Sequence, residues 1–296
     1  MKGFEGEILV KLSLLGLFTV VGIPLNLAQF ATIYRKGHLC NSNDIFLASL
    51  SLADVSHLLQ KIIFSLLYSL DAVHPNKTRY AVSLAVFLTV SHLICMTLER
   101  LIAVKRPFWY RSNVTRGRAV QTCIAIWVIG LFSTVAIFLL DVYIDRVILL
   151  RTTTLVTMCF IFASGFTFII AYLYIIHTIL SRKKKRKSFH LTSVSSQDSS
   201  SSKQSLKKHE RKTVIMCLSY TGLFLIFNFP YAITYVLNIK ERIWFMVLQL
   251  ANCLVNSTVY FWLNYGQNRE SERTENETRS TQIEMQSQLR SGQLIK

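Results

Sequence analysis

Four ionisable residues stand inside long apolar stretches of the sequence, where a charge is costly. Glu99 and Arg100 are adjacent in LERLIAVKRPF, Asp54 lies in LASLSLADVS, and Lys61 lies in LLQKIIFSLLYSLD. An ionisable group in an apolar medium must be neutralised or paired, and it marks a candidate functional site. The acid next to an arginine can form an ion pair, whereas the lone carboxylate and the lone ammonium need other partners.

Arg100 has two acidic candidates as partners. Glu99 precedes it directly, and Glu210 stands in KKHERK at the start of a later apolar run. If the ends of these two runs are adjacent, Arg100 could exchange one acid for the other, and such an exchange would free the end of a helix. An arginine that merely extends to the membrane interface is the alternative.

Asp54 has candidate neighbours that carry oxygen ligands. Thr89 lies in a second apolar run, and Asn252 and Asn256 lie in the last one. Oxygen atoms around one carboxylate could hold a small hard cation. The alternative is a protonated acid that is hydrogen-bonded within a packed bundle.

The apolar stretches that must position these residues are long enough to cross a membrane as helices. About 20 apolar residues span the roughly 30 Å of hydrocarbon, and a helix satisfies its own backbone hydrogen bonds there. Short alternating strands typical of a membrane barrel are absent from the sequence. The first run is too long for a cleaved signal peptide, so we expect an uncleaved anchor. Seven runs are predicted to span: 8–34, 44–70, 80–104, 119–140, 152–180, 212–238 and 242–264, the last being the weakest because Gln249, Asn252 and Asn256 interrupt it.

The distribution of basic residues predicts the orientation of the chain. The net charge is +17, with eighteen Lys or Arg in the odd-numbered loops against six in the even-numbered loops. Because basic loops stay on the cytoplasmic side, this bias favours membrane insertion over nucleic-acid binding as its explanation. The sequence therefore predicts an all-α integral membrane protein, a seven-transmembrane helix bundle with the N-terminus outside and the C-terminus in the cytoplasm.

The segments outside the predicted spans are short, with one exception. Residues 1–7 would form a short extracellular stub, and 266–296 a polar cytoplasmic tail. The loop 181–211 is rich in lysine, arginine and serine, and its low hydrophobicity predicts disorder. Asn76 begins a glycosylation sequon in a predicted outer loop, where modification is expected.

Several short motifs follow one another in a familiar order. They are Asn26 in PLNLAQ, Leu52-Ala53-Asp54, Glu99-Arg100-Leu101, Pro107 seven residues after the arginine, Trp127, Phe224 and Pro230 in the sixth run, and NSTVY at 256–260. Together they resemble the rhodopsin-like family of G-protein-coupled receptors over about residues 8–265.

The resemblance implies a mechanism and a set of residue roles. Arg100 would pair with Glu99 and Glu210 in the resting state and meet a heterotrimeric G protein in the active state. The sixth helix would move outward about Pro230. Other expected parts are an allosteric sodium site at Asp54, Thr89, Asn252 and Asn256, and activation switches at Tyr172, Phe224, Pro230, Asn256 and Tyr260. The resemblance further implies a plasma-membrane receptor without enzymatic activity or a cofactor other than sodium, with arrestin and receptor kinases as additional partners.

The ligand is constrained chiefly by departures from the family pattern. Val82 stands where amine receptors carry an aspartate, and Leu250 stands where opsins carry a lysine, so neither class is favoured. Lys61 could extend to the interface, pair with Asp71, or neutralise an acidic ligand. We expect a small, lipid-like or short-peptide ligand in a pocket lined by Lys61, Phe87, Asn228, Tyr231, Tyr235 and Gln249.

Two other classes of membrane protein remain as alternatives. A transporter or channel with a seven-helix bundle would often show two related halves, and the sequence shows no internal repeat. A membrane-embedded enzyme would need clustered His, Asp or Glu within the spans, and the seven histidines are scattered without ligand spacing.

Overall fold

The computed structural model describes residues 2–35, 41–70, 75–190, 200–236 and 247–265, together with residue 280. Within these helices the side chains of 2–12, 68–69, 75–82, 183–190, 200–212, 231 and 234–236 lie outside the description. Everything below refers to the described residues.

The described chain is helical, and its helices follow the predicted apolar runs. In chain order they are α1 (Lys2–Arg35), α2 (Ser42–Ser69), α3 (Pro75–Lys105), α4 (Pro107–Asn113), α5 (Arg116–Tyr143), α6 (Arg146–His190) and α7 (Ser200–Val236), followed by a helical segment at 247–265. The predicted all-α class is confirmed over these residues.

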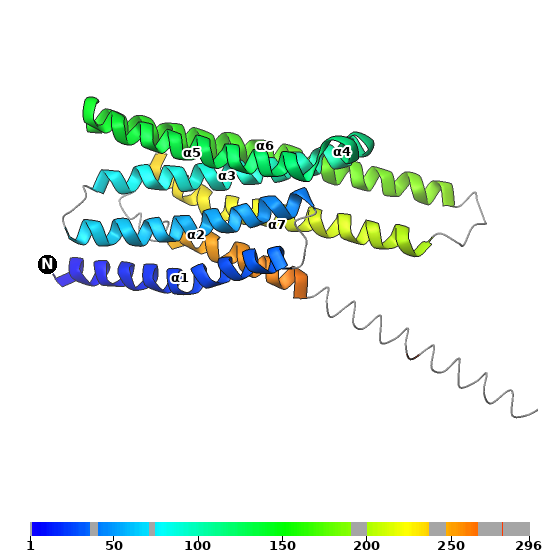
Figure 1. Ribbon diagram of the computed structural model, residues 1–296, viewed down its shortest axis with the longest axis horizontal. Helices are drawn as coiled ribbons and strands as arrows, with labels where there is room; N and C mark the ends of the chain where they lie inside the picture. The colour runs from blue at the N-terminus through cyan, green and yellow to red at the C-terminus, as the bar shows by residue number, and fades with distance from the viewer. Residues whose placement is uncertain are drawn as a thin grey trace, which may run out of the picture.

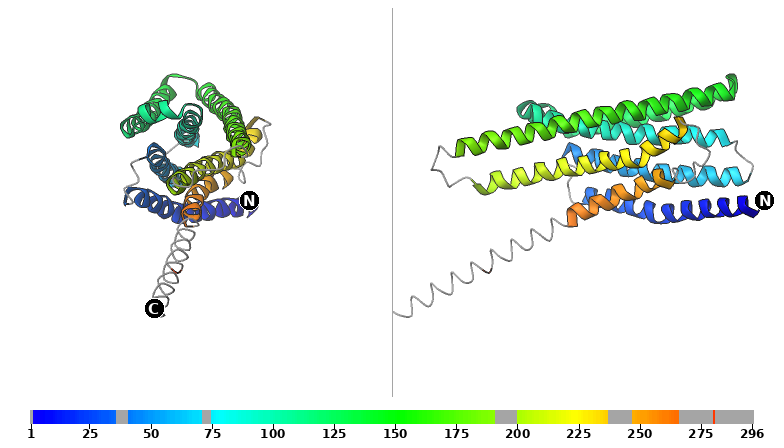
Figure 2. Two further views of the ribbon diagram at one scale, coloured as in Figure 1. Left: turned by 90° about the vertical axis from the view of Figure 1, so that its right-hand side faces the viewer. Right: turned by 180° about the vertical axis from the view of Figure 1, so that it is seen from behind.

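The long helices lie side by side as a bundle of roughly parallel rods, with consecutive rods running in opposite directions (Figure 1, Figure 2). Helix α3 is central, because it packs against α2, α5, α6 and α7. The core follows from this placement: Leu88, Val90 and Leu93 of α3 are almost fully buried. This core holds the middle of the bundle, while α4 lies across one end of it.

Six of the helices are long and apolar enough to cross a membrane: Ser13–Arg35, Ser42–Leu67, Ser83–Lys105, Arg116–Tyr143, Arg146–Arg182 and Thr213–Pro230. Their outward faces are apolar, as lipid requires. On α5, for example, Ile124, Phe132 and Val135 are more than half exposed. The segment 247–265 falls outside these six, because its amides lower its hydropathy. The chain is therefore a multi-pass membrane protein, and its orientation stays a prediction.

The connection between α5 and α6 is shorter than the expected outer loop of about ten residues. Only Ile144 and Asp145 separate the two helices. The Asp145 carboxylate accepts hydrogen bonds from the backbone N–H groups of Val147 at 2.8 Å and Ile148 at 3.1 Å. An acid at this position satisfies the free N–H groups that begin a helix, so α6 starts immediately after the turn.

Three segments differ from the sequence expectations. The loop 181–211, expected to be disordered, continues as helix to His190 at the end of α6 and again from Ser200 at the start of α7. Lysine and arginine are good helix formers, and a helix already nucleated in the membrane extends easily. Asn76 was expected in a loop but belongs to the first turn of α3, and its side chain lies outside the description.

Candidate functional site

The most highly charged buried cluster lies where α3 ends and α4 begins, here called the Arg100 end of the bundle. Arg100 Nη2 donates to Glu99 Oε1 at 2.9 Å, and the two side chains are 11% and 3% exposed. Removing one partner of such a buried pair leaves an uncompensated charge, which costs about 3–5 kcal/mol. The ion pair predicted between these neighbours is therefore present and buried.

Tyr110 of α4 completes this cluster, and the sequence analysis did not anticipate it. Its hydroxyl donates to Glu99 Oε1 at 2.6 Å and accepts from Arg100 Nη2 at 3.3 Å. Burial raises the pKa of the Tyr110 phenol well above its usual range, so the hydroxyl stays protonated and able to donate. The available signal was Pro107, which is favoured in the first turn of a helix and turns the chain so that Tyr110 faces α3.

The second acidic partner expected for Arg100 cannot be placed. Glu210 belongs to α7, but its side chain lies outside the described residues. Among the residues that are described, Arg100 Nε and Glu99 Oε2 have no hydrogen-bond partner. Arg100 therefore keeps one donor with which a second acid could interact.

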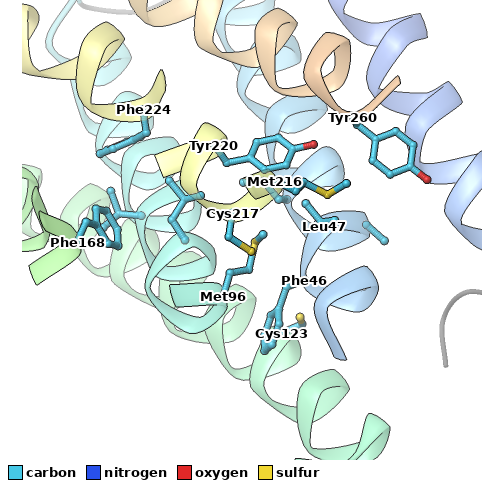
Figure 3. Close-up of a cluster of buried hydrophobic side chains, with 14 of the residues drawn as sticks. Phe46, Leu47, Met96, Cys123, Phe168, Met216, Cys217, Tyr220, Phe224 and Tyr260 are labelled. Atoms are coloured by element: carbon cyan, nitrogen blue, oxygen red, sulfur yellow. The ribbon is translucent and has the colours of Figure 1, made fainter. Parts of the chain in front are cut away.

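Helix α7 packs closely beside this cluster through its aromatic and sulfur-containing residues. Figure 3 shows Cys217, Tyr220 and Phe224 of α7 together with Met96 of α3 and Phe168 of α6. The rings of Phe168 and Phe224 meet edge to face, with centroids 6.4 Å apart. Phe224, predicted as a switch residue, is thus buried at the junction of α6 and α7.

Cys217 and Thr221 form hydrogen bonds from α7 to its neighbours near the Arg100 end. Cys217 Sγ donates to Asn43 Oδ1 of α2 at 3.3 Å. Thr221 Oγ1 donates to the Tyr172 hydroxyl of α6 at 3.4 Å, and that hydroxyl also lies 3.4 Å from Thr97 Oγ1 of α3. Tyr172 therefore joins three helices through weak contacts, and little hydrogen-bond energy opposes a change in its position.

Farther along α7, close packing replaces these weak contacts. A Cβ added at Gly165 of α6 would lie 2.6 Å from Phe229 Cζ, so the ring of Phe229 from α7 occupies the space beside this glycine. Phe229 also packs edge to face on Phe162, with centroids 5.2 Å apart. Pro230 follows directly inside α7 and removes a backbone hydrogen bond there. Helix α7 is therefore packed tightly against α6 at Phe229, next to the proline that interrupts its backbone hydrogen bonds.

Asp54 lies in the middle of the bundle and is 1% exposed. Asn256 Nδ2 donates to its Oδ2 at 3.0 Å, as the sequence analysis predicted for neighbours in a polar cluster. Within the described part of the chain, Asp54 Oδ1, Asn252 Oδ1 and Asn256 Oδ1 have no hydrogen-bond partner. Thr89 is buried as well, at 6% exposed. Free oxygen acceptors beside a carboxylate suit a hard cation.

The side chains around Asp54 offer mainly oxygen ligands. The residues that the structure describes contain no group of three His, Cys, Asp or Glu side chains able to hold a metal ion. Asp54 contributes one carboxylate, and the remaining oxygens come from neutral amides. Oxygen ligands of this kind suit a hard cation better than zinc or iron.

Asn26 ties α1 to the segment 247–265. Its Nδ2 donates to the backbone oxygens of Gly22 at 2.9 Å and Cys253 at 3.0 Å, and its Oδ1 accepts from Ser257 Oγ at 2.8 Å. Ser257 occupies the position where the resembled motif has proline. Its hydroxyl supplies a hydrogen bond that a proline could not make.

His92 forms a second network that the sequence analysis missed. Its Nδ1 lies 2.7 Å from the Leu88 carbonyl oxygen, and its Nε2 lies 2.7 Å from Ser49 Oγ. Trp127 Nε1 donates to the same Ser49 oxygen at 3.1 Å. Nδ1 must carry the hydrogen to meet a carbonyl, so Nε2 accepts from Ser49. This network joins α2, α3 and α5, and the motif residue Trp127 therefore serves to position helices.

The residues predicted to line a ligand pocket are only partly brought together. Lys61 and Gln249 are buried at 7% and 3% exposed, on α2 and on the segment 247–265. Phe87 stacks on Phe160 with centroids 5.9 Å apart, and Asn228 Nδ2 donates to its own helix at Phe224 O. The side chains of two further predicted lining residues, Tyr231 and Tyr235, lie outside the description.

Tyr260, predicted as a switch residue, lies at the Arg100 end of the segment 247–265. It is 5% exposed and packs edge to face on Phe261, with centroids 5.4 Å apart. Figure 3 shows it near Tyr220 of α7 and Leu47 of α2. Tyr260, like Phe224, is therefore buried inside the bundle.

Comparison with known proteins agrees with this arrangement. Residues 25–264 match the family described as 7 transmembrane receptor (rhodopsin family), which is more than half of the chain. This range includes residues 247–264, which make up all but the last residue of the least apolar segment. It therefore counts that segment among the receptor's seven spans.

Individual receptors are similar over shorter segments. Mas-related G-protein coupled receptor member B2 of Mus musculus is 27% identical over 134 residues, covering 43% of this chain and 38% of that receptor. Type-1 angiotensin II receptor B of Rattus norvegicus is 29% identical over 138 residues, covering 44% and 38%. Type-1 angiotensin II receptor of Cavia porcellus is 27% identical over 154 residues, covering 50% and 41%.

The matched segments span about two fifths of the length of these curated relatives. The family match is broader, and it coincides with the helices that carry the Arg100 cluster and the Asp54 cluster. The chain belongs to the rhodopsin family of seven-transmembrane receptors.

Proposed function

We propose that this protein is a plasma-membrane receptor that senses an extracellular ligand and activates a heterotrimeric G protein. The N-terminus would lie outside, and the Arg100 end of the bundle would face the cytoplasm, where arrestin and receptor kinases could also act. The ligand would be small, lipid-like or a short peptide. A transporter or channel is the alternative, and the family match favours the receptor.

The observation that carries this proposal is the buried cluster of Glu99, Arg100 and Tyr110. A guanidinium bound to a carboxylate at 2.9 Å and to a hydroxyl at 3.3 Å is held inside the bundle. Opening the cluster would expose a cation at the proposed cytoplasmic face. This closed cluster would be the resting state, and activation would be a shift in population toward an opened one.

The packing of α7 suggests how the cluster would open. Near Cys217 and Thr221 the helix is joined to its neighbours by a thiol hydrogen bond and by a hydroxyl hydrogen bond of 3.4 Å, whereas at Phe229 it is packed against Gly165. A helix that is fixed at one level and weakly attached below it can swing about that level. We assign Pro230 as the pivot and the Arg100 end of α7 as the moving part.

The Asp54 cluster would regulate this equilibrium by binding sodium. Asp54 Oδ1, Asn252 Oδ1 and Asn256 Oδ1 supply acceptor oxygens, and Thr89 is buried on α3. A cation there would join α2, α3 and the segment 247–265. Because it would stabilise the packed arrangement, bound sodium would favour the resting state.

The test measures nucleotide exchange on a panel of Gα subunits in cells that display the tagged receptor at their surface. Glu210→Ala is expected to raise ligand-free exchange, because it removes the second acidic partner proposed for Arg100. Adding Arg100→Ala to Glu210→Ala is expected to abolish that exchange. Arg146→Ala removes an exposed arginine at the opposite end of the bundle and, as the control, should change nothing.

Two results would overturn the proposal. One is retained exchange in the Arg100→Ala variant at normal surface expression. The other is the absence of any Gα response to Glu210→Ala in a well-expressed receptor. In either case the cluster would be a structural feature of the helix end.

A further inference from the structure

A column of buried polar side chains follows the seam between α2 and the segment 247–265. Asp54 and Asn256 meet at 3.0 Å, and His57 Nδ1 lies 3.5 Å from Cys253 Sγ. The residue number rises along α2 as it falls along the segment, so the two helices are antiparallel in this register. The column is therefore fixed by two independent contacts.

One more turn along the seam brings Lys61 opposite Gln249. Lys61 follows His57 by four residues, and Gln249 precedes Cys253 by four. Residues four apart share a helix face, so the two side chains continue the column on facing sides. Lys61 is only 7% exposed, so its side chain stays inside the bundle at this level.

The groups at this level have hydrogen-bonding capacity that the described residues do not use. Gln249 is 3% exposed, and neither its Nε2 nor its Oε1 has a hydrogen-bond partner in the described chain. His57 is 5% exposed, and its Nε2 also has no hydrogen-bond partner in the described chain. Buried polar atoms are normally hydrogen-bonded. The unused atoms of Gln249 and His57, which lie one helical turn apart along the seam, therefore indicate a binding site.

The chemistry of the column changes along its length. Around Asp54 the free atoms are oxygens, which suit a cation. Around Lys61 there are an ammonium, an amide N–H₂ of Gln249 and, when the Cys253 thiol donates to Nδ1, an N–H at His57 Nε2. Positively charged and N–H donors together bind an oxyanion, and a carboxylate can accept from several of them.

The surroundings of this subsite are apolar. Leu15, Leu58 and Leu250 are buried against Cys253, and Phe18 and Ile62 pack on them. An inorganic ion would gain nothing from these side chains, whereas the hydrocarbon body of an organic acid would. The charge and the apolar surroundings together favour a carboxylate attached to an apolar body.

We infer that Lys61, His57 and Gln249 form the subsite that binds the carboxylate of this receptor's ligand. The inference rests on the proposed function, because it assigns the chemical class of the ligand. The carboxylate could belong to an alkyl carboxylic acid or to the C-terminus of an apolar peptide. Both sources present the same group to Lys61.

The test compares charged and neutral probes by thermal unfolding of the full chain in nanodiscs of zwitterionic lipid, followed by tryptophan fluorescence. Decanoate is compared with decanamide and decylamine, and the peptide Phe-Leu-Leu with its C-terminal amide. At roughly ten times its Kd, at least one free carboxylate is expected to raise the unfolding midpoint by about 3 °C, and the neutral partners are not.

The variants assign the effect to the subsite. Lys61→Met is expected to abolish the shift, Lys61→Arg to retain it, and Gln249→Leu to weaken it. Lys105→Met removes an exposed lysine at the Arg100 end and should leave the shift unchanged. The comparison of acid with amide on the unaltered protein needs no variant, so a misfolded mutant does not prevent the test.

Three results would overturn the inference: no shift with either free carboxylate, equal shifts with acid and amide, or a full shift in Lys61→Met. The assay contains no G protein. Carboxylate binding without nucleotide exchange would therefore count against the proposed function alone, and exchange activity without carboxylate binding would count against the subsite alone.

Discussion

Replacing Tyr110 by phenylalanine removes one hydroxyl from the cluster that holds Arg100 and leaves the ring in place. The lost contacts are the donation to Glu99 Oε1 at 2.6 Å and the acceptance from Arg100 Nη2 at 3.3 Å. The ring of Tyr110 lies 6.0 Å from the Arg100 guanidinium carbon, and that contact would be kept. The substitution therefore tests the hydroxyl alone.

The free energy lost in Tyr110→Phe can be estimated because the hydroxyl bonds to charged groups, Glu99 and Arg100. A hydrogen bond to a charged group contributes about 1.5–3 kcal/mol, and the lower figure applies because Tyr110 is only partly buried. If the bond exists in the resting state alone, losing about 1.4 kcal/mol raises the ratio of active to resting receptor about tenfold. A receptor that is about 1% active without ligand would become about 10% active.

The assay is the initial rate of ligand-free nucleotide exchange on purified G protein by receptor in nanodiscs. Tyr110→Phe should raise this rate about tenfold. Tyr174→Phe on α6, which removes a hydroxyl from a partly exposed ring near Lys105, should not change it. An unchanged rate in a folded Tyr110→Phe receptor would show that the hydroxyl does not hold the resting state, and the assignment of the cluster would have to be withdrawn.

Two further predictions concern the packing of α7 and the sodium site. Gly165→Ala should lower the unfolding midpoint, because the added Cβ would lie 2.6 Å from Phe229. Overpacking of this kind costs about 1–3 kcal/mol. Gly16→Ala is the control, because nothing lies within 4 Å of its added Cβ. An equal midpoint for both variants would mean that α6 and α7 separate freely at this level. Replacing choline chloride by sodium chloride should raise the midpoint of the unaltered receptor and leave that of Asp54→Asn unchanged, since the variant lacks the carboxylate. Equal salt responses would exclude sodium binding at Asp54.

Much of the candidate site could be anticipated from local sequence. Glu99 and Arg100 are neighbours, so their pairing needed no knowledge of the fold. The contact between Asp54 and Asn256 could be predicted only by assuming that two distant apolar runs meet. Those runs contain few polar residues, so Asp54 had few candidate partners. Buried polar groups in an apolar span have few partners to choose from, which is why such pairs are predictable.

Other parts of the site escaped prediction for identifiable reasons. Tyr110 approaches Glu99 only because α4 turns the chain after Pro107, and a seven-residue helix leaves no clear periodic signal. His57 shares a helix face with Asp54 and Lys61, three and four residues away, so the spacing could have revealed it. His92 has no such companion, and its contact with Ser49 depends on how α2 and α3 are rotated.

The sequence by itself determined the helical class, the approximate spans and the presence of a costly acid–arginine pair, because the hydrocarbon thickness of a membrane sets the length and composition of anything that crosses it. Only the tertiary structure decided which faces of the helices meet. It placed Tyr110 on Glu99, brought His57 to Cys253 across one seam, and brought Phe229 against Gly165. Such choices depend on rotation and close packing between helices, which hydropathy along one chain does not encode.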